Sequence, residues 1–254
     1  MNLMRDQFPE IGGFCDTLLG YDLCFPAADK EPWIQIFHVP GIDHWIVTSK
    51  RKETNVISIF DSLNNSAGKD DSSRKKKGTF NKTEHVLGCI SAVLRTKEKS
   101  FRYQYVGCQQ QLPNDCGLHA IANAVSLALM EDPANCVYDR KVMRYHLKQI
   151  LDSKLITPFP KSKKKQDIIL SESSRIKNVK VYCHCRRIHY VPIMESRRKD
   201  WATIQCTRCM EWFHKMCERW PKGSTRGTWL CKICQQTSWK EDWTIYRAKF
   251  GMAL

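Results

Sequence analysis

The chain has 254 residues, 42% of them apolar, and a formal net charge of +15 at pH 7, a composition typical of a folded protein with one large or two modest domains. No apolar run approaches the roughly 20 residues that a membrane-spanning helix needs, and residues 1–9 contain Arg5 and Asp6 instead of the hydrophobic core of a secretion signal. The 13 cysteines are odd in number and seven of them stand at metal-ligand spacing, which favours metal binding in a reducing compartment over disulfides.

The positive charge is concentrated in the second half of the chain. Residues 1–152 contain 19 Lys and Arg against 18 Asp and Glu, whereas residues 153–254 contain 22 against 8. This asymmetry predicts two functional units with different partners. The expected units are a first domain at 1–152, a basic linker at 153–180, a second domain at 181–237 and a C-terminal tail at 238–254.

Strand-like and helix-like segments are mixed along the first domain. Two strands flanking the charged turn 50–55 form an expected hairpin, and the polar stretch 64–79 predicts a solvated loop. The helix expected over 117–130 is apolar nearly all round and should be buried. Together these segments predict an α+β domain with a small central sheet. The other expected elements are a short helix within 1–19, strands at 33–39 and 103–106, and helices over 82–97 and 139–151.

Cys116 is the candidate nucleophile because it stands where a strand-like segment turns into an apolar helix. The partial positive charge at a helix N-terminus favours the thiolate over the thiol. Gln110, six residues upstream, can reach back over the turn. Its side-chain amide and the backbone N–H of Cys116 could together bind a developing oxyanion.

His44 and Asp61 are the candidate base and the acid that orients it. His44 starts the first strand of the expected hairpin and Asp61 follows the second. Because a hairpin brings these two ends together, Asp61 would fix the imidazole and His44 would act as base for Cys116. Three other histidines are expected to be packed rather than catalytic: His38, His119 and His146.

These motifs resemble the ubiquitin-like-protein (SUMO/sentrin) protease family of cysteine peptidases. The resemblance covers residues 1–152 and rests on His44-Trp45, Asp61-Ser62-Leu63, and Gln109-Gln110 before Asp115-Cys116-Gly117. It implies a papain-like cysteine protease domain that cleaves after the Gly-Gly end of a ubiquitin-like modifier, with Trp45 flanking the channel for that tail. The implied catalytic roles are nucleophile for Cys116, general base for His44, orienting acid for Asp61 and oxyanion donor for Gln110.

Four pairs of metal ligands lie in the second half of the chain. Eight such ligands within about fifty residues predict two tetrahedral zinc sites. A segment this short cannot bury enough surface to fold alone, so we expect it to unfold without metal. The pairs are Cys183-x-Cys185, Cys206-x-x-Cys209, His214-x-x-Cys217 and Cys231-x-x-Cys234.

The order of four cysteines, one histidine and three cysteines resembles a PHD finger, as do Trp212 and Trp229, each two residues before a ligand. The resemblance implies a two-zinc cross-brace, in which the first and third pairs share one ion and the second and fourth pairs share the other. It also implies a histone-tail ligand, and the candidates for an aromatic cage around methyl-lysine are Trp212, Tyr182 and Tyr190. A RING variant with the same ligand order keeps a ubiquitin ligase open, and the basic loop 186–198 would suit nucleic-acid phosphates instead.

The sequence therefore predicts a nuclear cysteine peptidase or isopeptidase that acts on precursors or conjugates of SUMO or a relative. Two structural zinc ions would hold a finger that targets the enzyme to chromatin. Two alternatives stay open: a catalytically idle chromatin or nucleic-acid adaptor, and a viral-type or transposon-type protease that processes an ordinary polypeptide. The lysines at 161 and 163–165 are either a nuclear localisation signal or a solvated charged segment.

Overall fold

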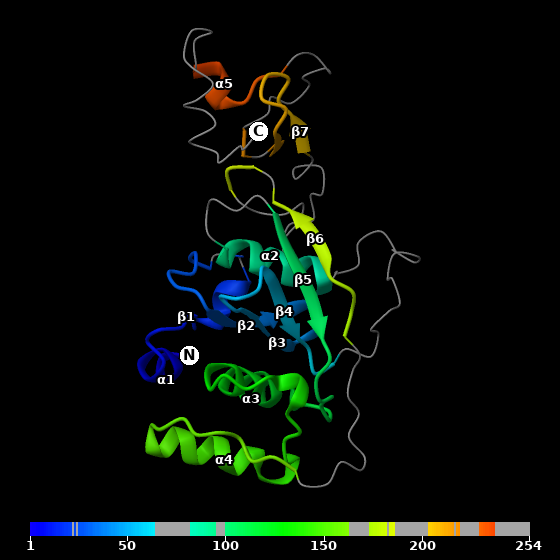
Figure 1. Ribbon diagram of the computed structural model, residues 1–254. Helices are drawn as coiled ribbons and strands as arrows, with labels where there is room; N and C mark the ends of the chain where they lie inside the picture. Colours follow the sequence, from blue (N-terminus) through cyan, green and yellow to red (C-terminus); the bar gives the residue numbers. More distant parts are fainter. Residues whose placement is uncertain are drawn as a thin grey trace.

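A mixed sheet with helices on both of its faces forms the main body of the computed structural model (Figure 1). The expected loop at 64–79, the tail at 238–254 and the lysines at 163–165 lie outside the residues that the structure describes. These described residues are 1–21, 23, 25–63, 82–94, 100–162, 173–181, 183–185, 203–215, 217–218 and 229–236.

The sheet has six strands in the order β1-β2-β3-β4-β5-β6. The pairs β1–β2 and β4–β5 are parallel, and the other neighbouring strands are antiparallel. The small central sheet expected from the sequence is therefore present. Its strands are β1 (Gly12–Gly13), β2 (Trp33–Val39), β3 (His44–Lys50), β4 (Val56–Phe60), β5 (Ser100–Val106) and β6 (Lys177–Lys180).

Helices cover the two faces of this sheet. α2 (Lys82–Val93) packs on one face, α3 (Cys116–Ala128) packs on the other, and α4 (Arg140–Ser153) lies outside α3 (Figure 1). Shorter helical segments are α1 (Asn2–Gln7), η1 (Thr17–Gly20), η2 (Pro40–Ile42) and η4 (Pro133–Asn135).

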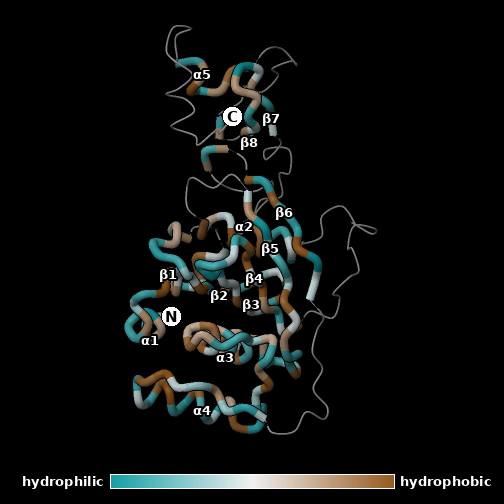
Figure 2. Tube along the Cα trace, viewed as in Figure 1, coloured by the Kyte–Doolittle hydropathy of each residue, from teal (hydrophilic) through white to brown (hydrophobic). Residues whose placement is uncertain are grey.

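The alternation along β2 explains why both faces are apolar. Ile34 and Ile36 join the core shared with α3, whereas Trp33 and Phe37 join the core shared with α2. Successive strand residues point to opposite faces, so a strand covered on both sides is buried throughout, as β2 is. The hydropathy colours show the same arrangement, with hydrophobic residues in α3 and the central strands (Figure 2).

The helix that carries Cys116 is the buried one. Ten of the 13 residues of α3 are buried, in agreement with its apolar sequence. By contrast α4 buries only Met143 and Ile150, and it begins at an N-cap in which the Asp139 side chain accepts a hydrogen bond from the Lys141 backbone. Many side chains of α4 therefore stay outside the core and are available to form one wall of a site beside α3.

Both ends of the expected linker pack against the first domain. Ile156 and Phe159 are buried in the core shared with α3, and Gln7 exchanges two hydrogen bonds with the Ile156 backbone. Further on, β6 is the sixth strand of the sheet, and Ser174 hydrogen-bonds with the backbone of Tyr105 in β5. The first and last residues of the segment expected to be a linker thus both pack against the first unit.

The second unit is small and poor in regular structure. It contains the antiparallel pair β7 (Thr203–Gln205) and β8 (Trp212–His214) and the short helix α5 (Lys232–Gln236). Its buried cluster consists of Phe213 and four cysteines. Among the helices that the structure describes, none combines the length and hydrophobicity of a membrane span.

Candidate active site and metal centres

Cys116 is the first residue of α3, at the end of the turn that follows β5. Asn114 has a left-handed backbone, with φ of 67°, a conformation that asparagine tolerates better than most residues. Asp115 is the N-cap residue, but its side chain makes an ion pair with Arg144 of α4 instead of capping the helix. The half-buried thiol of Cys116 therefore lies at the positive end of a 13-residue helix.

The predicted pairing of His44 with Asp61 is present. His44 Nε2 donates to Asp61 Oδ1 at 2.7 Å, and both side chains are almost completely buried. Asp61 also accepts from the Leu63 backbone at 3.0 Å and makes an ion pair with Lys82, the first residue of α2. Burial acts to raise the pKa of the Asp61 carboxyl, but His44 and Lys82 outweigh burial and the pKa is lowered. Asp61 is thus an ionised group that holds the imidazole from one side.

The tautomer of His44 follows from this bond. With the proton of Nε2 directed at Asp61, Nδ1 is the nitrogen left to accept a proton. Cys116 Sγ makes no hydrogen bond with any residue that the structure describes, so thiol and imidazole are not in hydrogen-bond contact here. Such catalytic contacts are often long without substrate and shorten in the complex.

Trp45 links the two halves of the candidate site. It follows His44 in β3, and a Cβ atom added to Gly117 would lie 3.6 Å from its Cδ1. The indole therefore stands in van der Waals contact with the first turn of the Cys116 helix. His44 is adjacent in sequence to Trp45, and Cys116 is adjacent to Gly117. The contact between Trp45 and Gly117 therefore places His44 and Cys116 at the same edge of the sheet.

Three consecutive glutamines before Cys116 have different partners. The Gln109 side-chain amide donates through Nε2 to the Tyr138 carbonyl at 3.2 Å and accepts through Oε1 from the Tyr138 N–H at 2.8 Å. Gln111 accepts from the Ser62 hydroxyl at 2.7 Å. The Gln110 Nε2 amide donates to the backbone carbonyls of Asp61 and Cys108, at 3.3 Å and 3.1 Å. This turn is therefore fixed from three directions.

Gln110 does not direct its amide hydrogens to the thiol. Both are used by carbonyl oxygens, and Oε1 is buried without a hydrogen-bond partner among the described residues. Arg140 donates to the Gln110 backbone carbonyl and holds this segment against the start of α4. Gln110 can donate to an oxyanion only after it gives up its hydrogen bond to the carbonyl of Asp61 or of Cys108. In this structure its amide nitrogen is fully used by these two carbonyls.

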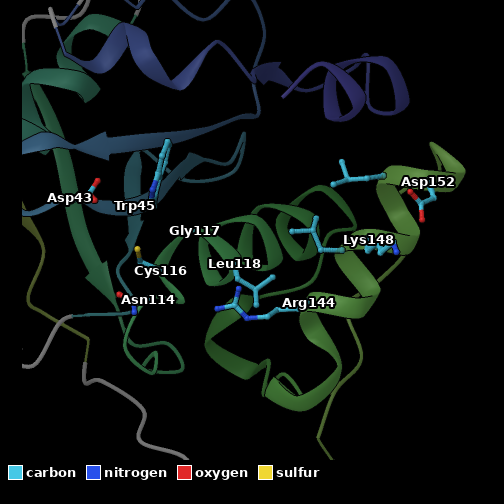
Figure 3. Close-up of a pocket in the computed structure, with 11 residues that line it drawn as sticks. Asp43, Trp45, Asn114, Cys116, Gly117, Leu118, Arg144, Lys148 and Asp152 are labelled. Carbon is cyan, nitrogen blue, oxygen red and sulfur yellow. The ribbon is translucent and has the colours of Figure 1, made fainter.

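A cleft of about 590 Å³ opens beside Cys116. Figure 3 shows Trp45 and Cys116 on one side and side chains of α4 on the other. The cleft passes over the first turn of α3, so a chain lying in it would cross the thiol. Its lining residues are Asp43, Trp45, Asn114, Cys116, Gly117, Leu118, Arg144, Leu147, Lys148, Leu151 and Asp152.

His119, the histidine on α3, has the surroundings of a packed core residue. His119 is fully buried, neither ring nitrogen has a hydrogen-bond partner among the described residues, and its ring meets that of Tyr138 edge-on. Burial lowers the pKa of His119 to about 4, and the charge of Arg140 adds to this effect. The imidazole is therefore neutral at pH 7 and forms part of the core behind Cys116.

The eight predicted metal ligands form two clusters. Within each cluster the four ligand atoms lie within 4.8 Å of one another, and the four cysteines of the second set are all buried. The first and third ligand pairs share one cluster and the second and fourth share the other, which is the interleaved arrangement that the resemblance to a PHD finger implies. The sets are Cys183, Cys185, His214 and Cys217, and Cys206, Cys209, Cys231 and Cys234.

These donor sets fit metal ions of the kind that thiolates and imidazole bind. His214 Nδ1 lies 3.2 Å from Cys185 Sγ and 3.9 Å from Cys217 Sγ, separations suited to ligands of one tetrahedral ion. The hydrogen bond from Cys185 lowers the pKa of Cys183 to about 3, which favours the metal-binding thiolate. An ion held by all four ligands of either cluster would have no open coordination position, which is the arrangement typical of structural sites.

Two predicted cage residues, Tyr182 and Tyr190, lie outside the described residues. Trp212 is 41% exposed on β8, and its backbone carbonyl accepts from Cys183 N at 3.0 Å. Trp229 packs instead against the buried ring of Phe213, with centroids 5.7 Å apart. Of the two tryptophans near metal ligands, Trp212 is therefore the one with a solvent-facing ring.

Several residues of the site carry no signal in the sequence. Lys82 reaches the buried Asp61 from α2, and nothing distinguishes it from the chain's other lysines. Tyr138 and Arg140 hold the glutamine turn from a segment about thirty residues away. The α4 wall of the cleft follows from the packing of α4 on α3, which periodicity alone does not specify.

No protein-family model matches the sequence, and the comparison with curated proteins also finds no match. Among solved structures, the chain is similar to "SUMO protease Ulp1 with the catalytic cysteine oxidized to a sulfonic acid". The sequence identity is 16%, the similarity covers 61% of this chain and 75% of that chain, and the TM-score is 0.40.

Proposed function

We propose that the first unit is a cysteine peptidase with Cys116 as its nucleophile. The observation that carries the proposal is the buried His44–Asp61 hydrogen bond of 2.7 Å at the edge where Cys116 opens α3. The cleft that passes the thiol supplies a place for the scissile bond. Each of these features would have a role in acyl transfer: an acid that holds a base, a thiol at a helix N-terminus and a cleft for the substrate.

The proposed reaction proceeds through a thioester. Nδ1 of His44 takes the proton of Cys116 Sγ, and the sulfur attacks the scissile carbonyl carbon. The tetrahedral intermediate collapses as the protonated imidazole gives its proton to the leaving amine. A water molecule, deprotonated by His44, then attacks the thioester and releases the acid and the free thiol. Gln110 is the proposed oxyanion donor, after its amide exchanges one of its carbonyl partners.

The proposed substrates are precursors or conjugates of a ubiquitin-like modifier that ends in Gly-Gly, of which SUMO is one example. The resemblance of the sequence motifs supports this choice, and so does the contact between Trp45 and Gly117. We place the Gly-Gly tail in the cleft beside the Trp45 indole, which lies against the first turn of α3 next to Cys116. Glycine is the residue that permits such close approach.

The second unit is proposed to be a PHD-type finger with two structural zinc ions, which brings the peptidase to chromatin in the nucleus. The exposed ring of Trp212 supports a peptide ligand such as a histone tail. The excess of Lys and Arg in residues 153–254 favours nucleic-acid phosphates as the alternative ligand. Binding of histone-tail peptides and of duplex DNA, compared in wild type and Trp212→Ala, distinguishes the two.

Hydrolysis of C-terminal fluorogenic amides tests the catalytic proposal. We expect the wild type to cleave at least one intact ubiquitin-like modifier amide about 100-fold faster than the isolated tail peptide, because remote contacts help to place the reacting carbonyl. Cys116→Ala should abolish cleavage, and Cys15→Ser, which alters a half-buried cysteine outside the cleft, should retain it.

Two other results would redirect the proposal. Equal rates for modifier and tail peptide would indicate a protease that processes ordinary polypeptides. No cleavage of any substrate by folded, zinc-loaded protein would indicate a catalytically idle adaptor, an outcome consistent with the occupied amide of Gln110.

A further inference from the structure

A second histidine–aspartate pair lies at the cleft, on the turn that leads into the catalytic strand. His38 near the end of β2 is the register partner of Trp45 in β3, and the helical turn η2 joins the two strands. His38 Nε2 lies 2.8 Å from Oδ1 of Asp43, the residue immediately before His44. The bond therefore spans the turn and ties β2 to the chain that enters the active site.

The imidazole of His38 is packed between two aromatic rings. Its centroid is 4.6 Å from that of Trp45 and 5.2 Å from that of Tyr21. The ring is buried, and Nδ1 has no hydrogen-bond partner among the described residues, so the proton lies on Nε2 and is directed at Asp43. Asp43 consequently sets both the tautomer and the rotation of a ring that contacts the indole.

Asp43 is an unusual residue to find in such a bond. Its side chain is 92% exposed, and its backbone is left-handed with φ of 45°. An exposed carboxylate on a turn is usually solvated and changes the stability of the protein little. We therefore expect Asp43 to affect the geometry of its own turn rather than the stability of the fold. The bond holds the direction of the turn that presents His44 and Trp45.

The pair cannot replace His44 as the base. The Trp45 ring contacts the His38 ring and also lies against Gly117. The indole therefore connects His38 with the Cys116 helix. A change at His38 can therefore reach the cleft through the position of Trp45. This arrangement assigns a role to a histidine expected from the sequence to be simply packed.

We propose that His38 and Asp43 are positioning residues that hold the Trp45 indole at the cleft wall and thereby determine how a substrate backbone is seated beside Cys116. The inference rests on the proposed peptidase function for its kinetic consequence. The placement of Trp45 is independent of that function and can be measured without substrate.

The test uses substitutions that separate the effect of the hydrogen bond from the effects of the left-handed backbone at Asp43 and of the aromatic ring at His38. Asp43→Asn keeps an acceptor oxygen and tolerates the left-handed backbone, whereas Asp43→Gly keeps only the backbone. His38→Phe keeps an aromatic ring and loses the bond. Each full-length variant is labelled with 5-fluorotryptophan, and the fluorine resonance of Trp45 is assigned by its absence in Trp45→Phe.

We expect Asp43→Asn to keep the Trp45 resonance of the wild type, because the asparagine oxygen can still accept from His38. Asp43→Gly and His38→Phe should shift or broaden the Trp45 resonance while the other tryptophan resonances stay in place. On the modifier amide these two variants should raise KM about tenfold with a smaller change in kcat, as expected when substrate seating is loosened. Circular dichroism and thermal unfolding establish that each variant is folded.

An unchanged Trp45 resonance in Asp43→Gly and His38→Phe would overturn the proposal, whatever the activity. A displaced resonance with unchanged KM would also overturn it, because Trp45 would then not seat the substrate. Absence of hydrolysis by the wild type counts against the peptidase function alone, since the fluorine spectra still report whether His38 and Asp43 hold the indole.

Discussion

Removal of zinc should unfold the second unit while the first unit stays folded. Among the described residues of the second unit, the buried cluster consists of one phenylalanine and four cysteines that are candidate metal ligands, so these residues bury little apolar surface that could replace a metal as a source of stability. Structural zinc contributes roughly 10 kcal/mol or more to folding in small domains. Without it the ligand side chains of each cluster would have no ion to hold them together, and the short pair β7–β8 would lose its support.

Hydrogen exchange monitored by mass spectrometry separates the two units in one experiment. On treatment with a strong chelator, peptides from 203–215 and 229–236 should lose their protection, whereas peptides from α3 and β2 should keep theirs. Cys206→Ser, which removes one buried ligand, should reproduce the effect, and Cys15→Ser should not. Protection of 203–215 and 229–236 that persists in metal-free protein would contradict a zinc-dependent fold.

Replacement of His44 by alanine should lower kcat/KM by a factor of about 10² to 10⁴, the usual contribution of a positioned general base. His44 is the only described residue that combines a hydrogen bond to buried Asp61 with a place next to Trp45. The same variant should slow alkylation of Cys116 by iodoacetamide, because the neutral thiol would lack its proton acceptor. Alkylation needs no substrate and therefore isolates activation of the thiol.

Asp61→Asn provides the graded comparison. An asparagine oxygen can still accept from His44 Nε2, but the negative charge that stabilises the protonated imidazole is lost, so we expect a decrease smaller than that of His44→Ala. Lys82 would lose its ion-pair partner at the same time, and thermal unfolding shows how much of the effect is structural. His146→Gln, on α4 and outside the cleft, is the control histidine substitution. Equal alkylation rates in wild type and His44→Ala would contradict the assigned base.

The parts of the site that could be predicted are those encoded by local patterns. The hairpin of β3 and β4 follows from two β-patterned segments around a charged turn, and it brings His44 and Asp61 together. The position of Cys116 follows from the change from strand to helix. In the second unit, the spacing of ligand pairs and the resemblance to a PHD finger anticipate the interleaved clusters.

The parts that could not be predicted depend on contacts between distant segments. β6 is a four-residue, lysine-rich strand, too short and too polar to stand out from a linker, and it becomes a strand because β5 has a free edge. The partners of the Gln110 amide depend on where the carbonyls of Asp61 and Cys108 come to lie. His38 has the sequence surroundings of a packed histidine, and only the turn geometry places Asp43 within reach.

The most direct test of the central claim is covalent capture of the nucleophile. Folded, zinc-loaded protein is mixed with a panel of ubiquitin-like modifiers that carry an electrophile in place of the C-terminal carboxylate, and the products are analysed by intact mass and peptide mapping. We expect a one-to-one adduct with at least one modifier, located on Cys116 and absent from Cys116→Ala. An adduct on another cysteine, or no adduct with any modifier, would contradict the claim that Cys116 is the nucleophile of a ubiquitin-like-modifier peptidase.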